Sequence, residues 1–70
     1  MFKYYILIVP VNNETLVSEI KTIQAFTGMK AIEKLAKMLE RQQQGLSSKY
    51  SYRLFKNLKN AEKSLKRLSC

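Results

Sequence analysis

The first apolar run of the chain lies at residues 3–9, where β-branched and aromatic side chains dominate. The run is too short for a helix, and it is apolar on both of the faces between which a strand alternates. Tyr4, Ile6 and Ile8 would point to one side, and the odd-numbered residues of the run would point to the other. Such a strand is typical of a central or doubly covered position, so we expect it to lie inside a sheet.

Turn-forming residues separate this run from a second strand. Pro10 cannot donate to a strand ladder, and the Asn-Asn-Glu sequence at residues 12–14 predicts a turn because asparagine tolerates the left-handed backbone. Residues 20–26 predict the second strand, and the short connection predicts an antiparallel hairpin. Residues 16–18 either extend the turn or begin this strand.

A helix follows, with a polar cap at its start. Thr27 can accept a hydrogen bond from a free N–H group of the first turn, and apolar residues then recur at helical spacing over residues 28–43. Gly45 can adopt the left-handed conformation that often ends a helix. The residues expected on the buried side are Ile32, Leu35, Ala36 and Leu39, with Ala31 and Met38 beside them.

The last third of the chain fits two interpretations. Residues 48–68 could form one long amphipathic helix, because leucine and alanine recur at helical spacing. Alternatively, residues 49–55 form a third strand and a second helix begins after Asn57. We favour the strand, since Tyr50 and Tyr52 alternate as strand residues do and asparagine suits a helix cap better than a helix interior.

Together these elements predict an α+β fold, with a single domain over residues 1–70 and the order β-β-α-β-α. We expect a three-stranded antiparallel sheet with two helices on one face. Seventy residues bury only a modest core. Because the first strand is apolar on both sides, the open face of the sheet would favour a homodimer or another protein partner.

The composition argues against an enzyme and against a metal or cofactor site. The chain has no histidine and no aspartate, so it lacks the commonest general base and the commonest metal ligand. Its one cysteine is Cys70, which can form no intrachain disulfide. The two glycines are isolated, so the sequence has no glycine-rich phosphate loop. We expect a non-catalytic protein without a cofactor.

The charge indicates an anionic partner. Thirteen lysines and arginines against five glutamates give a net charge of +8, and residues 49–70 carry seven of these cations with a single glutamate. This charge draws a protein toward nucleic acid, anionic membranes or acidic protein surfaces. The apolar run at residues 4–11 is too short to span a membrane and lacks a signal-peptide cleavage site. We therefore expect a cytoplasmic protein without a membrane partner.

Two groups of cations are candidate binding surfaces. The first follows i, i+4, i+7 and i+11 spacing and would form one stripe on the helix predicted at residues 28–43. A solvated helix face explains any one of these residues, but stacking like charges costs stability. The second group is denser, and its helix needs its apolar side to cover the sheet, which disfavours a membrane-surface helix. The groups are Lys30, Lys34, Lys37 and Arg41, and Lys49, Arg53, Lys56, Lys59, Lys63, Lys66 and Arg67.

A third candidate surface is aromatic. Tyr50 and Tyr52, with Tyr4 or Tyr5 and Phe26, would share the sheet face that the helices leave open. Aromatic rings among cations can stack on unpaired bases. The alternative, which we favour, is that these rings belong to the core or to a dimer interface.

The segment TIQAFTGMKAIEKLAKM, at residues 22–38, resembles small phage-encoded proteins, among them some type I anti-CRISPR inhibitors. The similarity consists of a strand with an I-x-A pattern, a threonine cap and an A-x-x-x-L helix start. Some members of that group use basic surface residues to grip the CRISPR surveillance ribonucleoprotein where target DNA would lie. The resemblance implies an inhibitory role, with Lys30, Lys34 and Lys37 as contact residues.

Two functions fit these observations. In the first, a small phage or mobile-element inhibitor docks on a host nucleoprotein, such as a CRISPR surveillance complex, or on an acidic protein surface. The alternative is direct, weakly specific binding of DNA or RNA through phosphate contacts, either as a monomer or as a dimer.

Overall fold

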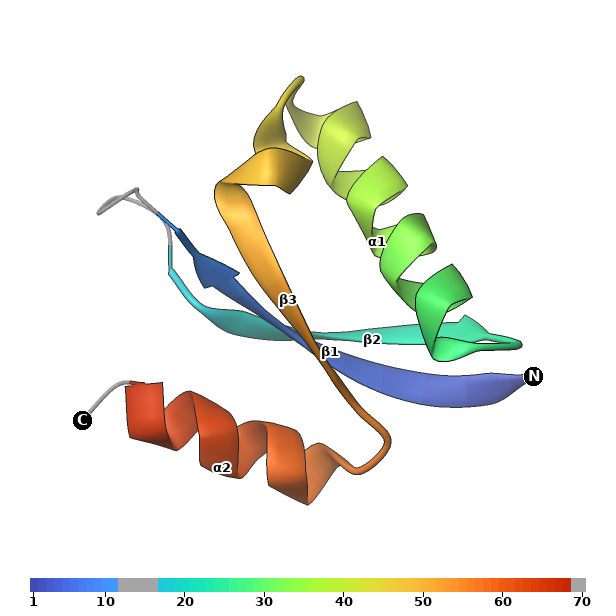
Figure 1. The fold of residues 1–70 in the computed structure, drawn as a ribbon, viewed down its shortest axis with the longest axis vertical. Coiled ribbons are helices and arrows are strands. Elements are labelled where there is room, and N and C mark those ends of the chain that lie inside the picture. The colour runs from blue at the N-terminus through green and yellow to red at the C-terminus, as the bar shows by residue number, and fades with distance from the viewer. Residues whose placement is uncertain (12–16, 69–70) are drawn as a thin grey trace.

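The described residues form three strands, two α-helices and one short 3-10 helix. The computed structural model describes residues 1–11 and 17–68. In chain order the elements are β1 (Phe2–Pro10), β2 (Glu19–Ala25), α1 (Gly28–Gln42), the 3-10 helix η1 (Leu46–Lys49), β3 (Tyr50–Phe55) and α2 (Leu58–Leu68) (Figure 1). The predicted α+β class and β-β-α-β-α order are confirmed, and β3 excludes one long C-terminal helix. The turn predicted at residues 12–14 lies outside the described residues.

β1 is the central strand, as its two apolar faces predicted. The sheet order is β2-β1-β3, and both pairings are antiparallel. Ile6 illustrates the register, because it lies opposite Lys21 of β2 and opposite Leu54 of β3. Paired residues direct their side chains to the same face of a sheet, so this register assigns every strand residue to one of two sides.

α1 covers the side of the sheet that carries the even-numbered residues of β1. The predicted buried face of the helix is confirmed at Leu35 and Leu39, while Ala31 is fully buried rather than flanking and Met38 is exposed. Burial of these apolar side chains is the main stabilising contribution on this side. The core cluster here consists of Tyr4, Ile6, Ile8, Ile23, Ala25, Ala31, Leu35, Leu39 and Leu46.

α2 covers the other side of the sheet, so the expectation that both helices share one face is wrong. Leu7 points away from α1 and is nevertheless fully buried, and so is Ala61 of α2. α2 contacts all three strands, and Figure 1 shows the two helices on opposite sides of them. The physical reason is the doubly apolar β1, whose odd-numbered side chains also need cover. The face expected to be open for a homodimer is therefore occupied by α2.

Both helices begin at the caps that the sequence predicted. The Thr27 hydroxyl accepts a hydrogen bond from the Lys30 N–H group at 3.2 Å, in the first turn of α1. The Asn57 side-chain oxygen accepts one from the Lys59 N–H group at 2.8 Å, at the start of α2. These caps satisfy N–H groups that have no partner within the helix, and they fix where each helix starts.

A hydrogen-bonded loop carries the chain from α1 into β3. Gly45 has a φ of 82°, which is the left-handed conformation predicted for it. The Glu40 carboxylate accepts hydrogen bonds from the backbone N–H groups of Gly45 at 2.8 Å and of Ser47 at 3.2 Å, and from the Ser47 hydroxyl. The hydrogen bond from the Ser47 hydroxyl, followed by that from Gly45, lowers the pKa of Glu40.

Candidate functional site

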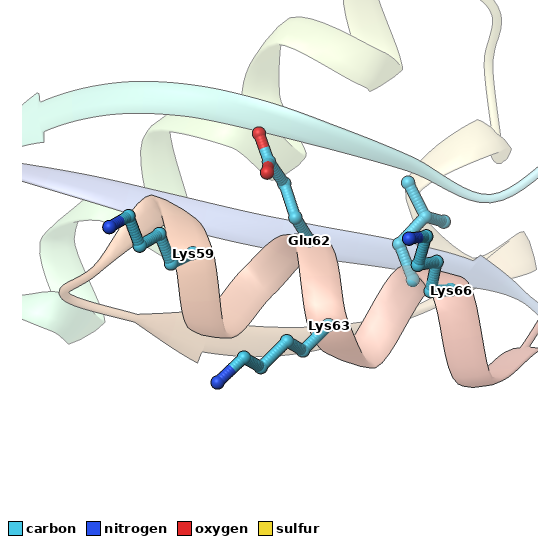
Figure 2. Close-up of a pocket in the computed structure, with 5 residues that line it drawn as sticks. Lys59, Glu62, Lys63 and Lys66 are labelled. Atoms are coloured by element: carbon cyan, nitrogen blue, oxygen red, sulfur yellow. The ribbon is translucent and has the colours of Figure 1, made fainter.

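The strongest candidate surface is the outward face of α2. A helix turns by about 100° per residue, so the buried Ala61 and the half-buried Leu65 leave the opposite side of α2 to its lysines. Lys59, Lys63 and Lys66 span two turns, or about 10 Å, along this side. In Figure 2, Lys63 points away from the strands. We call these three residues the α2 stripe.

The charge of the α2 stripe is balanced by few acids. Glu62 is the only acidic residue between position 41 and the end of the chain. Glu62 lines one hollow together with Lys59, Lys63 and Lys66, and in Figure 2 its side chain extends in a different direction from that of Lys63. Among the described residues, ion pairs join Lys21 to Glu19 at 2.8 Å and Lys30 to Glu33 at 4.0 Å, and neither involves Lys59 or Lys63. Exposed cations that outnumber the nearby acids attract anions from solution.

Some of the cations in the predicted stripe on α1 make contacts within the protein, and the others are exposed to solvent. Lys34 donates a hydrogen bond of 2.9 Å from its ammonium group to the backbone carbonyl of Gln24 in β2. Lys30 lies 4.0 Å from the Glu33 carboxylate. Lys37 and Arg41 are exposed farther along the helix and border a shallow hollow together with Lys34. Only part of this stripe is therefore available for a partner.

The two stripes lie on helices at opposite sides of the sheet (Figure 1). The sequence predicted two groups of cations as separate candidate surfaces but did not place them relative to each other. Because the sheet separates α1 from α2, a flat partner can contact either helix surface but cannot cover both outward faces. The fold thus divides the candidate residues into two separate surfaces.

The remaining predicted cations are spread around β3 and α2. Lys49 and Arg53 are exposed at the start and in the middle of β3, and Arg53 lies on the side of the sheet that α2 covers. Lys56 borders a hollow together with Lys3, Phe2 and Tyr4. Arg67 is exposed in the last turn of α2.

The aromatic residues do not share an open face, and the favoured alternative, a place in the core, is confirmed for Tyr4, Tyr50 and Tyr52. Tyr50 and Tyr52 are half-buried on the α1 side of the sheet, where they pack against the core. The Tyr52 hydroxyl donates a hydrogen bond of 2.6 Å to the Ser47 carbonyl, and loss of solvent around the ring is the main cause that raises its pKa. The reason is register, since Tyr52 pairs with Ile8 and points with it toward α1.

An exposed apolar corner was not anticipated from the sequence. Phe2 is 64% exposed, Phe26 is 70% exposed and Met29 is 74% exposed. Phe2 lies opposite Ala25 at the end of the β1–β2 pairing. Phe26 is the residue after Ala25, and Met29 lies in the first turn of α1, which begins at Gly28. The signal was available in the hairpin register, which places the first residues of the chain beside the end of β2. Clustered exposed apolar residues often mark protein contacts.

In the part of the chain that the structure describes, no helix has the length and apolar character needed to cross a membrane. Within the same residues, no three acidic, cysteine or histidine side chains form a group that could hold a metal ion. Comparison with protein-family models, curated proteins and solved structures found no match to this chain.

Proposed function

We propose that this protein is a non-catalytic docking protein that binds a nucleoprotein, with the α2 stripe as its main contact surface. The observation that carries the proposal is the display of Lys59 and Lys63 on the exposed side of α2, beside a hollow that three lysines line together with a single acid, Glu62. The phosphates of a nucleoprotein are dense anionic targets for such a surface.

The packing of α2 supports a nucleoprotein over a lipid surface. A membrane-surface helix needs a free apolar side. In this fold the apolar side of α2 contains the fully buried Ala61 and faces the strands, where Leu7 is also fully buried. Leu58 and Leu68 at the two ends of this apolar side are partly exposed, but its centre at Ala61 is closed to a partner, whereas the charged side of α2 is open along its length.

The exposed apolar corner supports a partner that contains protein as well as nucleic acid. Phe2, Phe26 and Met29 offer apolar contact area that a phosphate backbone does not use. The resemblance of residues 22–38 to type I anti-CRISPR inhibitors makes a CRISPR surveillance complex one specific nucleoprotein to test.

A quantitative pull-down tests the proposal. The tagged protein is expected to recover a stoichiometric protein partner, together with nucleic acid, from lysate of the cells in which it is made. The partner should remain bound after nuclease treatment if protein contacts contribute. The double variant Lys59→Glu/Lys63→Glu should lose most of the partner, whereas the matched variant Lys37→Glu/Arg41→Glu on α1 should retain it. Equal recovery by the wild type and the α2 variant would refute the assigned surface.

Direct nucleic-acid binding is the second candidate, and one observation favours it. The hollow bordered by Phe2, Lys3, Tyr4 and Lys56 places an exposed aromatic ring beside two cations. Such a site can stack an unpaired base while the cations contact phosphates. A mobility-shift titration against salt should then give a log-log slope set by the number of neutralised phosphates, and Phe2→Ala should weaken binding. Absence of a shift at low salt would exclude this function.

A further inference from the structure

We propose that the outer edge of β3 is a strand-addition site for an acidic, extended segment of a partner polypeptide. In this mode, a peptide pairs with a free sheet edge through backbone hydrogen bonds, and its side chains determine specificity. The site is separate from the α2 stripe and does not depend on the function proposed above.

The strand register fixes which backbone groups of β3 point outward. Val11 donates its N–H to the Lys49 carbonyl at 2.9 Å, so these two residues form a hydrogen-bonded pair. Hydrogen-bonded pairs alternate along an antiparallel ladder, and here they are the pairs that contain odd-numbered residues of β1. Arg53, opposite Leu7, therefore bonds inward to β1. Tyr52 and Leu54, opposite even-numbered residues of β1, direct their N–H and C=O groups away from it.

This edge is accessible along the strand. β3 is the last strand in the order β2-β1-β3. In Figure 1, which looks along the shortest axis, neither α-helix is drawn across β3. Among the described residues, no hydrogen bond occupies the outward backbone groups of Tyr52 and Leu54. The strand thus presents two consecutive outward-facing residues with free donors and acceptors.

The opposite edge of the sheet differs in one respect that matters. In the pairing of β2 with β1, the backbone groups of Ile23 hydrogen-bond to β1, whereas those of Gln24 point away from it. The Lys34 ammonium group donates a hydrogen bond of 2.9 Å to this outward-pointing Gln24 carbonyl. A side chain that occupies an edge carbonyl interferes with the approach of another strand. The two edges are therefore unequal, and β3 is the one that can accept a strand.

Charge determines the kind of strand that fits. The cations Lys49, Arg53 and Lys56 lie on or beside β3, and no acidic residue occurs between Glu40 and Glu62. Pairing β3 with β3 of a second copy would bring these cations together, which opposes self-association. An acidic segment gains attraction at the same positions. The occupant is therefore a partner segment with carboxylates on the side that carries Arg53.

The test uses the full chain and a defined probe, the capped eight-residue peptide (Glu-Val)4, with (Lys-Val)4 as control. Amide NMR spectra of the labelled protein should show saturable shifts and slowed hydrogen exchange at Tyr52 and Leu54 with the acidic peptide only. Shifts confined to α2, equal binding of both peptides, or no saturation at millimolar peptide would overturn the proposal.

Two variants at one position separate the backbone contribution from the side chain. Leu54→Pro removes an N–H group that points away from β1 and keeps the hydrogen bonds between β3 and β1. It should weaken peptide binding about threefold to tenfold relative to Leu54→Ala. Circular dichroism checks that both variants fold. Arg53→Glu is a surface change that should also weaken binding of the acidic peptide. Unchanged affinity in both Leu54→Pro and Arg53→Glu would overturn the site even if docking through α2 is intact.

Discussion

The ammonium group of Lys34 donates a hydrogen bond of 2.9 Å to the backbone carbonyl of Gln24, so a side chain of α1 occupies one position on the outer edge of β2. Removing the Lys34 side chain should expose this edge of β2. We expect Lys34→Ala to increase self-association at high protein concentration, because a free edge can pair with another chain. Sedimentation velocity measures the effect. Lys37→Ala is the matched control, since both variants remove one charge from α1 but only the first frees the Gln24 carbonyl.

The Glu40 loop predicts a dependence of stability on pH. The pKa of Glu40 is lowered in the folded state by its hydrogen bonds to Ser47 and Gly45, so the folded state favours the ionised carboxylate. This contribution to stability is present above the unfolded pKa of about 4.3 and is lost as the pH falls through the lower folded pKa. Glu40→Gln should lower the melting temperature at pH 7. The difference in melting temperature between this variant and the wild type should become smaller in acid. A constant difference from pH 7 to pH 3 would contradict this assignment.

Gly45 and Gly28 should respond differently to alanine. At Gly45 the positive φ alone opposes a side chain, because an added Cβ would meet nothing within 4 Å. Gly45→Ala should cost about 1–2 kcal/mol in unfolding free energy. At Gly28 the backbone is ordinary, and an added Cβ would meet the end of the Leu54 side chain, which is partly exposed and can rotate. We expect the smaller cost there, measured for both by urea denaturation.

The contact between α2 and the sheet can be tested at Ala61. This residue is fully buried, so a larger side chain would have to push α2 away from the strands. Ala61→Leu should cost about 1–3 kcal/mol. Asn60→Leu is a suitable control, because the exposed neighbouring residue can accept the same side chain without overpacking. If both variants unfold at the same urea concentration as the wild type, α2 does not pack as described.

The two N-caps should each contribute to stability. Thr27→Ala and Asn57→Ala each leave an N–H group in the first turn of a helix without its side-chain partner. Each substitution should lower the unfolding free energy by about 1 kcal/mol. Thr27→Ser and Asn57→Asp keep an accepting oxygen and should recover most of the loss. Failure of these conservative variants to recover it would show that the hydrogen bond is not the cause.

Local features of this fold could be predicted from the sequence because their causes are local. The caps at Thr27 and Asn57, the left-handed Gly45 and the third strand at Tyr50–Phe55 each depend on residues close in the chain. The placement of α2 could not be obtained in this way, because it depends on which strand face α1 leaves uncovered. The pattern of β1 did indicate that both faces need cover, but it did not indicate that α2 would provide the second cover.

The candidate site follows the same division. The spacing of the α2 stripe could be predicted, since helical periodicity alone places Lys59, Lys63 and Lys66 on one side. The separation of this stripe from the one on α1 could not, because it follows from α2 lying across the sheet. The core position favoured for Tyr52 is confirmed, but the side of the sheet on which it lies could not be predicted, because that depends on pairing with Ile8, which is distant in sequence.

The central position of β1 has a consequence for folding during synthesis. β1 is synthesised before its second neighbour, β3, and before the helix over Leu7, both of which come from residues 50–68. Until those residues emerge, one edge and one apolar face of β1 are exposed, and pairing distant segments is slow. The nascent chain therefore completes this fold only after residues 50–68 have emerged, and in the interval the apolar strand β1 is a natural target for a chaperone.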